Sequence, residues 1–172
     1  YLLQLWVYHP GQAQLAFNNM FVLDSLAMGI KLFTYITGII LVLYIDRYII
    51  DKKVQKGAFY SIFLFAILGM LVMISANNML VLYGGLELLS LALYGLIAMN
   101  TENVRATEAA MKFFILGALA SGILLYVISF IYVATGGMLQ LSDVSRVIYS
   151  SGGGMGGGIN HALLVFGLVF IV

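Results

Sequence analysis

Glu87 is a carboxylate near the middle of a segment, 79–98, whose other residues are almost all apolar. About 20 consecutive apolar residues are enough for a helix to cross the hydrocarbon core of a bilayer. A charged side chain at the centre of such a helix costs roughly 2.5–3.5 kcal/mol on insertion scales. An intramembrane carboxylate therefore marks a candidate proton or ion site.

Polar side chains recur around this carboxylate at helical spacing. With Glu87 they are four, three and four residues apart, which places all of them on one face of a helix: Tyr83, Ser90 and Tyr94. Lipid tails offer no hydrogen-bond partner, so this face must meet protein or water. The alternative interpretation is structural, with a protonated Glu87 holding two helices together through hydrogen bonds.

Lys112 is the natural partner of Glu87, because it lies 25 residues later, on the next apolar segment. We expect Glu87 about 12 residues and Lys112 about five residues from the connecting loop, at about 1.5 Å per residue. A water-bridged link then fits at least as well as a direct ion pair. Proton relay and a surface anchor paired with Glu108, four residues earlier, both remain open for Lys112.

Composition identifies the class of protein. The 172 residues are 63% hydrophobic and 9% charged, whereas soluble domains have roughly 45–50% and 25%. The chain is therefore expected in a lipid bilayer. It has no cysteine, which excludes disulfides, thiolate metal sites and iron–sulfur ligation by the chain itself. The net charge of +1 gives no reason to expect a nucleic-acid partner.

Hydropathy predicts a single all-α domain over 1–172, a polytopic bundle of transmembrane helices. The complete spans are expected at about 26–45, 57–76, 79–98 and 109–133, and partial spans at 1–8 and 161–172. The chain thus resembles an internal fragment of a longer protein. Asn77 and Asn78 should form a tight turn, and Thr107 should cap the fourth span. The glycine-rich segment 136–160 is predicted to be a flexible loop.

Basic residues in the short loops predict the orientation. Five fall on one side of the membrane: Arg47, Lys52, Lys53, Lys56 and Arg105. The other side has only Arg146. Loops 46–56 and 100–107 are therefore expected to be cytoplasmic.

Two further features of the spans have structural rather than chemical interpretations. Lys31 lies about five residues into the first span, seven residues after Asp24, and we expect it to snorkel toward the outer surface near that carboxylate. Small residues in the fourth span predict a close packing face between helices: Gly117, Ala118, Ser121 and Gly122.

Two stretches of the chain resemble a known family. They are 82–95, which contains Glu-Leu-Leu-Ser-Leu, and 107–122, which contains Glu-Ala-Ala-Met-Lys. Together they are similar to the antiporter-like membrane subunits of respiratory complex I, and within these to the subunit N (subunit 2) family of NADH:quinone oxidoreductase. By this resemblance Glu87 matches the glutamate of the family and Lys112 the lysine of the following helix. Lys31 matches no motif of the family.

The resemblance implies a subunit of about fourteen spans with two inverted repeats, as transporters often have, and the chain would contain only the opening of one proton route. It implies proton translocation coupled to NADH:quinone electron transfer, in a bacterial inner membrane, beside other membrane subunits of the complex. This chain would hold no redox centre; NADH, flavin, iron–sulfur clusters and quinone would belong to other subunits. A subunit of a sodium/proton antiporter or membrane hydrogenase, or a purely structural subunit, remains the alternative.

Overall fold

The computed structural model describes residues 13–51, 56–100 and 103–151. Most of these residues form four long helices: α2 (Ser25–Asp51), α3 (Lys56–Ile74), α4 (Met79–Ala98) and α5 (Val104–Ala134). All four are long and apolar enough to cross a membrane. The predicted fold class, a polytopic bundle of transmembrane helices, is confirmed.

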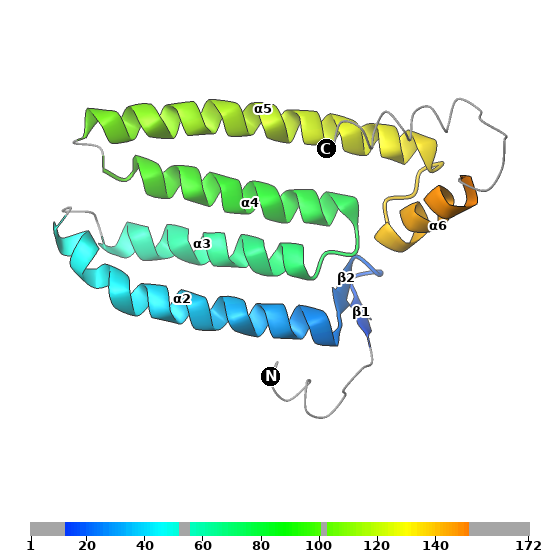
Figure 1. The fold of residues 1–172 in the computed structure, drawn as a ribbon, viewed down its shortest axis with the longest axis horizontal. Coiled ribbons are helices and arrows are strands. Elements are labelled where there is room, and N and C mark those ends of the chain that lie inside the picture. Colours follow the sequence, from blue (N-terminus) through cyan, green and yellow to red (C-terminus); the bar gives the residue numbers. More distant parts are fainter. Residues whose placement is uncertain (1–12, 52–55, 101–102, 152–172) are drawn as a thin grey trace.

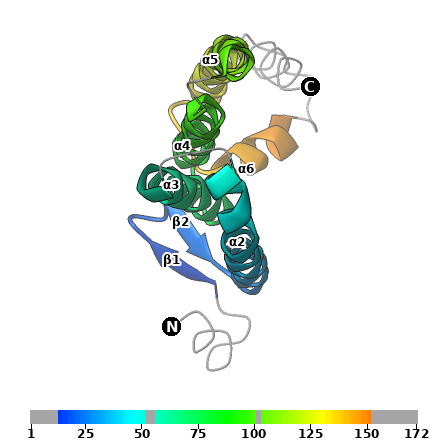
Figure 2. The same ribbon diagram turned by 90° about the vertical axis from the view of Figure 1, so that its left-hand side faces the viewer.

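The helices lie side by side in chain order, each antiparallel to the one before (Figure 1). The view down the helix axes shows one curved layer of helices (Figure 2). The α2–α3 and α4–α5 connections lie at one end of the helices, on the left of Figure 1, and the α3–α4 turn lies at the other end. In such a layer, an inner helix meets its two neighbours on opposite faces.

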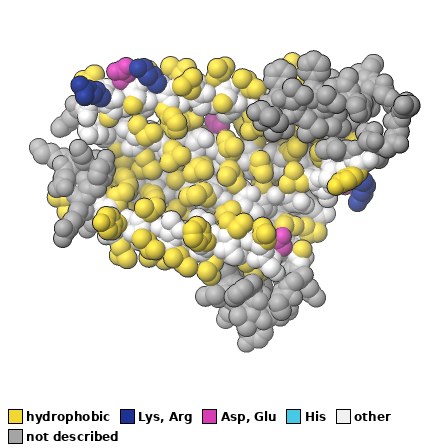
Figure 3. Space-filling view, viewed as in Figure 1, with side chains coloured by type: hydrophobic (Ala, Val, Ile, Leu, Met, Phe, Trp, Pro, Cys, Tyr) yellow, Lys and Arg dark blue, Asp and Glu magenta, His cyan; other side chains and the backbone are white. Residues whose placement is uncertain are grey.

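Apolar side chains cover most of one broad face of the helix layer (Figure 3). The Lys and Arg side chains visible on this face lie near the ends of the helices. Many large apolar side chains are exposed, among them Phe33, Leu43, Leu64 and Leu116. Exposed apolar area of this extent is typical of surfaces that meet lipid or further protein.

The helix bounds differ most from the predicted spans at the start of α5 and at the end of α2. The prediction that Thr107 caps this helix is wrong, because α5 already begins at Val104. The cap is Asn103, whose side chain accepts a hydrogen bond from the Arg105 N–H at 3.0 Å. Lys112 consequently lies eight residues after the first residue of the helix. The span 79–98 has the bounds of α4.

The ends of α2 and α3 also differ from the predictions, and several predicted segments lie outside the described residues. α2 continues to Asp51, so half of the predicted loop 46–56 is helical, and α3 ends at Ile74 rather than at 76. The predicted partial spans 1–8 and 161–172, Lys52, Lys53 and the glycine run 152–158 lie outside the described part.

Two small elements were not predicted, and both lie at the end of the helices where α3 turns into α4 (Figure 1). One is an antiparallel hairpin of β1 (Gln14–Ala16) and β2 (Phe21–Leu23). The other is helix α6 (Leu141–Ser151), which lies within the segment 136–160 that was predicted to be a loop. Its side chain Val144 packs with Val127 and Ile131 of α5 in a buried cluster. This contact gives the segment an apolar face to bury, and so a reason to be helical.

The α3–α4 turn joins these small elements to the helices. Asn78 caps α4 by accepting a hydrogen bond from the Leu80 N–H at 2.9 Å. The Asn77 N–H donates to the Met20 carbonyl on the hairpin side at 2.8 Å, and the Asn77 carbonyl accepts from the Leu141 N–H at 3.0 Å. The turn therefore has a fixed geometry at the place where α4 begins.

The tightest helix contact is a crossing of α3 and α4 at two glycines. A Cβ atom added to Gly85 would lie 2.9 Å from the Met73 nitrogen and 3.0 Å from the Gly69 carbonyl oxygen. A Cβ atom added to Gly69 would lie 2.7 Å from the Leu89 nitrogen. Because these neighbours include backbone atoms, they cannot move aside without moving a helix. The glycines thus fix the rotation of α4 about its own axis.

This crossing predicts unequal effects for two adjacent glycines. Gly85→Ala should destabilise the protein by about 1–3 kcal/mol, the usual cost of overpacking. Gly84 has no atom within 4 Å of an added Cβ, so Gly84→Ala should be neutral or stabilising by up to about 1 kcal/mol. Thermal unfolding of the full-length protein in detergent measures both. Equal effects of the two substitutions would contradict the proposed crossing.

Candidate functional site

The polar stripe of α4 lies on the face opposite its glycine contact with α3. Successive helix residues are about 100° apart, which places Glu87 about 160° around the helix from Gly85. Tyr83 and Tyr94 lie within about 40° of Glu87 on the same count. Since the helices form a row, the face opposite α3 meets α5 (Figure 1).

Two tyrosines of the stripe contact α5. The Tyr83 hydroxyl lies 3.4 Å from the Ser121 hydroxyl, close enough for a hydrogen bond. The Tyr94 ring packs edge-on against Phe113 and Phe114, with centroids 5.2 Å and 5.6 Å apart. The phenol groups therefore join α4 to α5 on both sides of Glu87 along the helix.

Gly117 provides the space for Tyr94. A Cβ atom added to Gly117 would lie only 1.6 Å from the Tyr94 hydroxyl oxygen, so any larger residue would displace the phenol. Gly122, in contrast, has nothing within 4 Å of an added Cβ. Of the small residues predicted to form a packing face, Gly117 and Ser121 contact the α4 tyrosines, whereas Gly122 faces open space.

Glu87 lies between these two contacts and is half-buried. Its Oε2 atom has almost no accessible surface and no hydrogen-bond partner among the described residues. Most buried polar atoms in proteins are paired, so an unpaired carboxyl oxygen needs an explanation. Such a group can be satisfied by a proton on the carboxyl, by a water molecule, or by a donor from another part of the protein. Ser90, one turn further along the stripe, is also half-buried.

The structure does not bring Lys112 and Glu87 together. The Lys112 ammonium forms an ion pair with Glu108 at 2.5 Å, and the two side chains are 71% and 60% exposed. Lys112 lies about 140° from Gly117 and about 180° from Ser121 around α5, so it points away from the α4 contact. This geometry fits the interpretation of Lys112 as a surface side chain paired with Glu108. Any link between Lys112 and Glu87 requires intervening groups.

Lys31 was expected to extend toward the outer surface near Asp24, and no ion pair joins these two residues in the described part of the chain. The Asp24 carboxylate instead caps α2, where it accepts a hydrogen bond from the Ala27 N–H at 2.7 Å. Lys31 is partly buried.

Within the described residues, no group of three or more His, Cys, Asp or Glu side chains could hold a metal ion. The site around Glu87 consists of one carboxyl, two phenols and serine hydroxyls. These groups exchange protons and bind water.

Sequence reasoning missed Ser121 and the pair Phe113 and Phe114 as partners of the stripe. A signal for them was present, because Phe114, Gly117 and Ser121 are three and four residues apart and share a helical face. The spacing could not predict the register between α4 and α5, which the tyrosine contacts determine.

Comparison with known proteins gives consistent results. The family model described as "NADH:quinone oxidoreductase/Mrp antiporter, TM" matches residues 76–172. NADH-quinone oxidoreductase subunit N of Herminiimonas arsenicoxydans is 45% identical over 99% of the chain and 34% of its own length. Subunit N of Nitrosomonas europaea is 47% identical over 94% of the chain and 32% of its own length.

A solved structure gives the same picture. A chain of respiratory complex I from Thermus thermophilus superposes with a TM-score of 0.67 at 30% identity, over 98% of this chain and 33% of that one. The chain therefore spans about a third of the length of the relatives it matches.

The packing of Tyr94 over Gly117 can be tested by a double-mutant cycle. Gly117→Ala should destabilise the protein because the phenol must move, and Tyr94→Leu should remove most of that penalty. We expect a coupling free energy of about 0.5–3 kcal/mol between the two positions, as for residues in contact. Gly122→Ala is the matched control and should show no coupling with Tyr94→Leu. Unfolding in detergent measures the wild type, the three single mutants and the two double mutants, and additive effects at Gly117 and Tyr94 would contradict the contact.

Proposed function

Because the chain belongs to the NADH:quinone oxidoreductase/Mrp antiporter transmembrane family, we propose that it is part of a proton-translocating membrane subunit of NADH:quinone oxidoreductase. The single observation that carries this proposal is the buried carboxyl oxygen of Glu87, which has no hydrogen-bond partner in the described part of the chain. It lies near the middle of a helix that is long and apolar enough to span a membrane. A carboxyl held there by protein on both sides can take up and release a proton.

The neighbours of Glu87 suit proton transfer. A charged carboxylate in an apolar interior is costly unless it is paired, whereas its neutral form can donate a hydrogen bond. The hydroxyl groups of Tyr83, Ser121 and Tyr94 each donate and accept. With bridging water they form a polar route between α4 and α5 that passes Glu87. The α3–α4 crossing at Gly85 keeps this route in register, because α4 cannot rotate.

Lys112 is proposed as a second station, nearer the α4–α5 connection. Glu87 is 11 residues from the end of α4 at Ala98, and Lys112 is eight residues from the start of α5 at Val104. The two groups thus differ in depth by about three residues, or about 5 Å along the helix axes. Because Lys112 faces away from α4, a proton passing between them needs water or residues from the rest of the protein.

The wider assignment follows the relatives. The relatives from Herminiimonas arsenicoxydans and Nitrosomonas europaea are both named as subunit N of NADH-quinone oxidoreductase. We place NADH, flavin, iron–sulfur clusters and quinone in other subunits, and quinone reduction there drives the protons. The partners of this chain are then further membrane subunits.

We also propose a bacterial inner membrane with the α2–α3 and α4–α5 connections in the cytoplasm. Lys56 and Arg105 are exposed and lie by these connections, at one end of the helices. Arg146 belongs to α6, which lies at the other end of the helices (Figure 1). This distribution agrees with the rule that cytoplasmic loops carry more basic residues.

A second candidate is a subunit of a sodium/proton antiporter, since the description of the matching family includes the Mrp antiporters. Copurification separates the two. NADH dehydrogenase activity bound to the full-length protein supports the first function, and sodium-dependent proton exchange without such activity supports the second.

Glu87→Gln tests the proton site. The amide keeps the size of the side chain but cannot carry a proton through the membrane, so proton translocation should fall at least tenfold while the complex still assembles. Reconstituted vesicles with a pH-sensitive dye measure the transport, and gel filtration measures the assembly. Glu87→Asp, which retains a carboxyl, should keep part of the activity. Normal translocation by an assembled Glu87→Gln complex would instead support a structural role.

Lys112→Ala should slow translocation less than Glu87→Gln, because Lys112 is exposed and water can take its place in a relay. Glu108→Gln removes only the partner of Lys112 and should have a smaller effect still. The same vesicle assay compares the three variants. A loss in Lys112→Ala that equals or exceeds the loss in Glu87→Gln would show that Lys112 is the more critical station.

A further inference from the structure

The contacts between α4 and α5 differ on the two sides of Glu87. Toward the α3–α4 turn the contact is polar, because the Tyr83 hydroxyl lies 3.4 Å from the Ser121 hydroxyl. Toward the α4–α5 connection it is aromatic, because the Tyr94 ring packs against two phenylalanines of α5. Hydroxyl groups can pass a proton along hydrogen bonds, whereas a phenylalanine side chain has no donor or acceptor. The two sides of Glu87 therefore resist the passage of a proton to different degrees.

Tyr94 carries the single hydroxyl of this three-ring cluster. It meets Phe113 and Phe114 with interplanar angles of 80° and 90°, the edge-to-face arrangement that aromatic rings favour. Its hydroxyl lies over Gly117, where the missing Cβ leaves room for it. Within the described part of the chain this hydroxyl forms no hydrogen bond. Packing thus holds the side chain in place, and a change of rotamer can move it without moving a helix.

The cluster lies between the two proposed proton stations in depth. Phe113 and Phe114 are nine and ten residues after the start of α5 at Val104. Lys112 is eight residues after that start, and Glu87 is 11 residues before the end of α4. The rings of α5 thus lie at a level between Lys112 and Glu87. Each phenylalanine is 48% exposed, and in a membrane span such apolar area meets lipid or further protein rather than bulk water.

The Tyr94 hydroxyl is also close in depth to the hydroxyl pair on the other side of Glu87. Gly117 and Ser121 are four residues apart in α5, about 6 Å along its axis. The hydroxyl over Gly117 and the pair at Ser121 are separated by about this distance along the axis. Two hydrogen bonds of about 2.8 Å span it, so the Glu87 carboxyl or one water molecule can connect them. A proton on Glu87 can therefore reach the Tyr94 hydroxyl, and beyond this hydroxyl it meets the aromatic rings.

We propose that Tyr94 gates the proton route on the side of the α4–α5 connection, an inference that rests on the proposed function of Glu87. With the ring over Gly117, the cluster excludes water from this part of the α4–α5 interface and separates Glu87 from Lys112. When the ring turns away, the space over Gly117 can admit water, which then connects the two stations. A pump needs such a barrier, because a route open on both sides of Glu87 at once would let protons flow back down their gradient.

Passive proton flux tests the gate in the full-length protein within its complex, reconstituted in vesicles with a pH-sensitive dye and an imposed pH gradient. Without NADH, the wild-type complex should hold the gradient. Tyr94→Leu removes the ring and should raise the passive flux severalfold. Tyr94→Phe keeps the ring and should be as tight as the wild type. Gel filtration checks that each complex assembles.

Two further variants test whether the leak passes through Glu87. Adding Glu87→Gln to Tyr94→Leu should restore the tight state, because the amide cannot carry the proton. A leak caused by loosened packing would persist in this double variant. Phe114→Leu opens the cluster from α5 and should also leak, and it takes the place of Tyr94→Leu in the test if that variant does not assemble.

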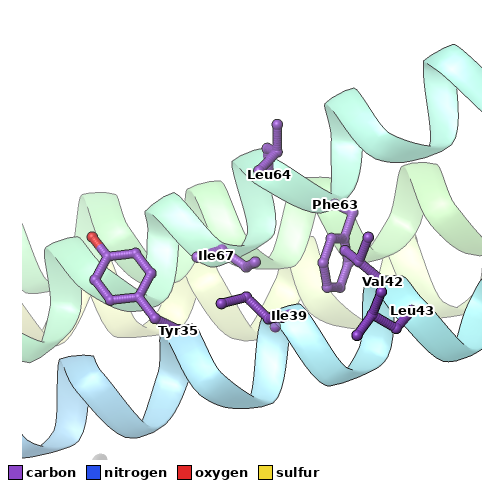
Figure 4. A pocket seen from close by; sticks show the side chains of 8 residues that line it. Tyr35, Ile39, Val42, Leu43, Phe63, Leu64 and Ile67 are labelled. Carbon is purple, nitrogen blue, oxygen red and sulfur yellow. The ribbon is translucent and has the colours of Figure 1, made fainter.

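A tyrosine outside the route provides the matched control. A groove of about 260 Å³ lies between α2 and α3, and its walls are almost entirely apolar (Figure 4). Tyr35 lines this groove from α2. Because α3 lies between α2 and α4 (Figure 1), Tyr35→Leu removes a phenol from a membrane span without opening the gate. This variant should not leak.

Three results would overturn the gate. They are an assembled Tyr94→Leu complex that holds the gradient, a leak of equal size in Tyr94→Phe or Tyr35→Leu, and a leak that persists when Glu87→Gln is added. Failure of the proposed function gives a different result, because Glu87→Gln alone would then translocate protons normally with NADH. A Glu87→Gln complex that cannot translocate protons, together with a tight Tyr94→Leu complex, would refute the gate and leave the proton site in place.

Discussion

The close approach of the α3 and α4 backbones at Gly69 and Gly85 is the constraint on which the candidate site depends. With no Cβ on either residue, the backbones come close enough to exclude any larger side chain. This contact packs one face of α4 against α3. The opposite face, which carries Tyr83, Glu87 and Tyr94, is then committed to α5. A rotation of α4 by a quarter turn would move the carboxyl out of that interface.

The carboxyl itself is the feature that packing alone does not explain. A leucine at position 87 would fill the space between α4 and α5 without any polar cost. Glu87 instead leaves a buried oxygen with no partner among the described residues, beside phenol and hydroxyl groups that can exchange protons. A site that binds and releases a proton needs this kind of incomplete pairing, because a fully paired carboxyl would hold one state.

Much of the fold was predictable because membrane spans carry a strong signal. The segment 79–98 was predicted with the bounds of α4, and the stripe on its face follows from spacing alone. The start of α5 was less predictable, since Asn103 and Thr107 are both good capping residues and the earlier one prevailed. Helix α6 was missed because its segment is short, partly polar and runs into the glycines, although Leu141, Val144 and Ile148 recur at helical spacing.

The relation of Lys112 to Glu87 shows where sequence reasoning ends. Spacing along the chain placed the two residues on consecutive antiparallel helices, at about 12 and five residues from the connecting loop, whereas the helix ends place them 11 and eight residues away. It did not give the rotation of α5, which the packing of Tyr94 over Gly117 determines. Once this rotation is known, Lys112 points away from α4 and pairs with Glu108. The depth of Lys112 thus depended on where α5 begins, and the facing of two helices needs a contact between them.

The most direct test of the central claim is infrared difference spectroscopy of the full-length protein as its proton load changes. If Glu87 is the buried proton site, a carboxylic acid carbonyl band will appear on protonation, be lost in Glu87→Gln and be retained in Glu108→Gln, because the Glu108 carboxyl is exposed. A spectrum with no such band, or a band that disappears in Glu108→Gln and persists in Glu87→Gln, would contradict the claim that Glu87 is the buried proton site.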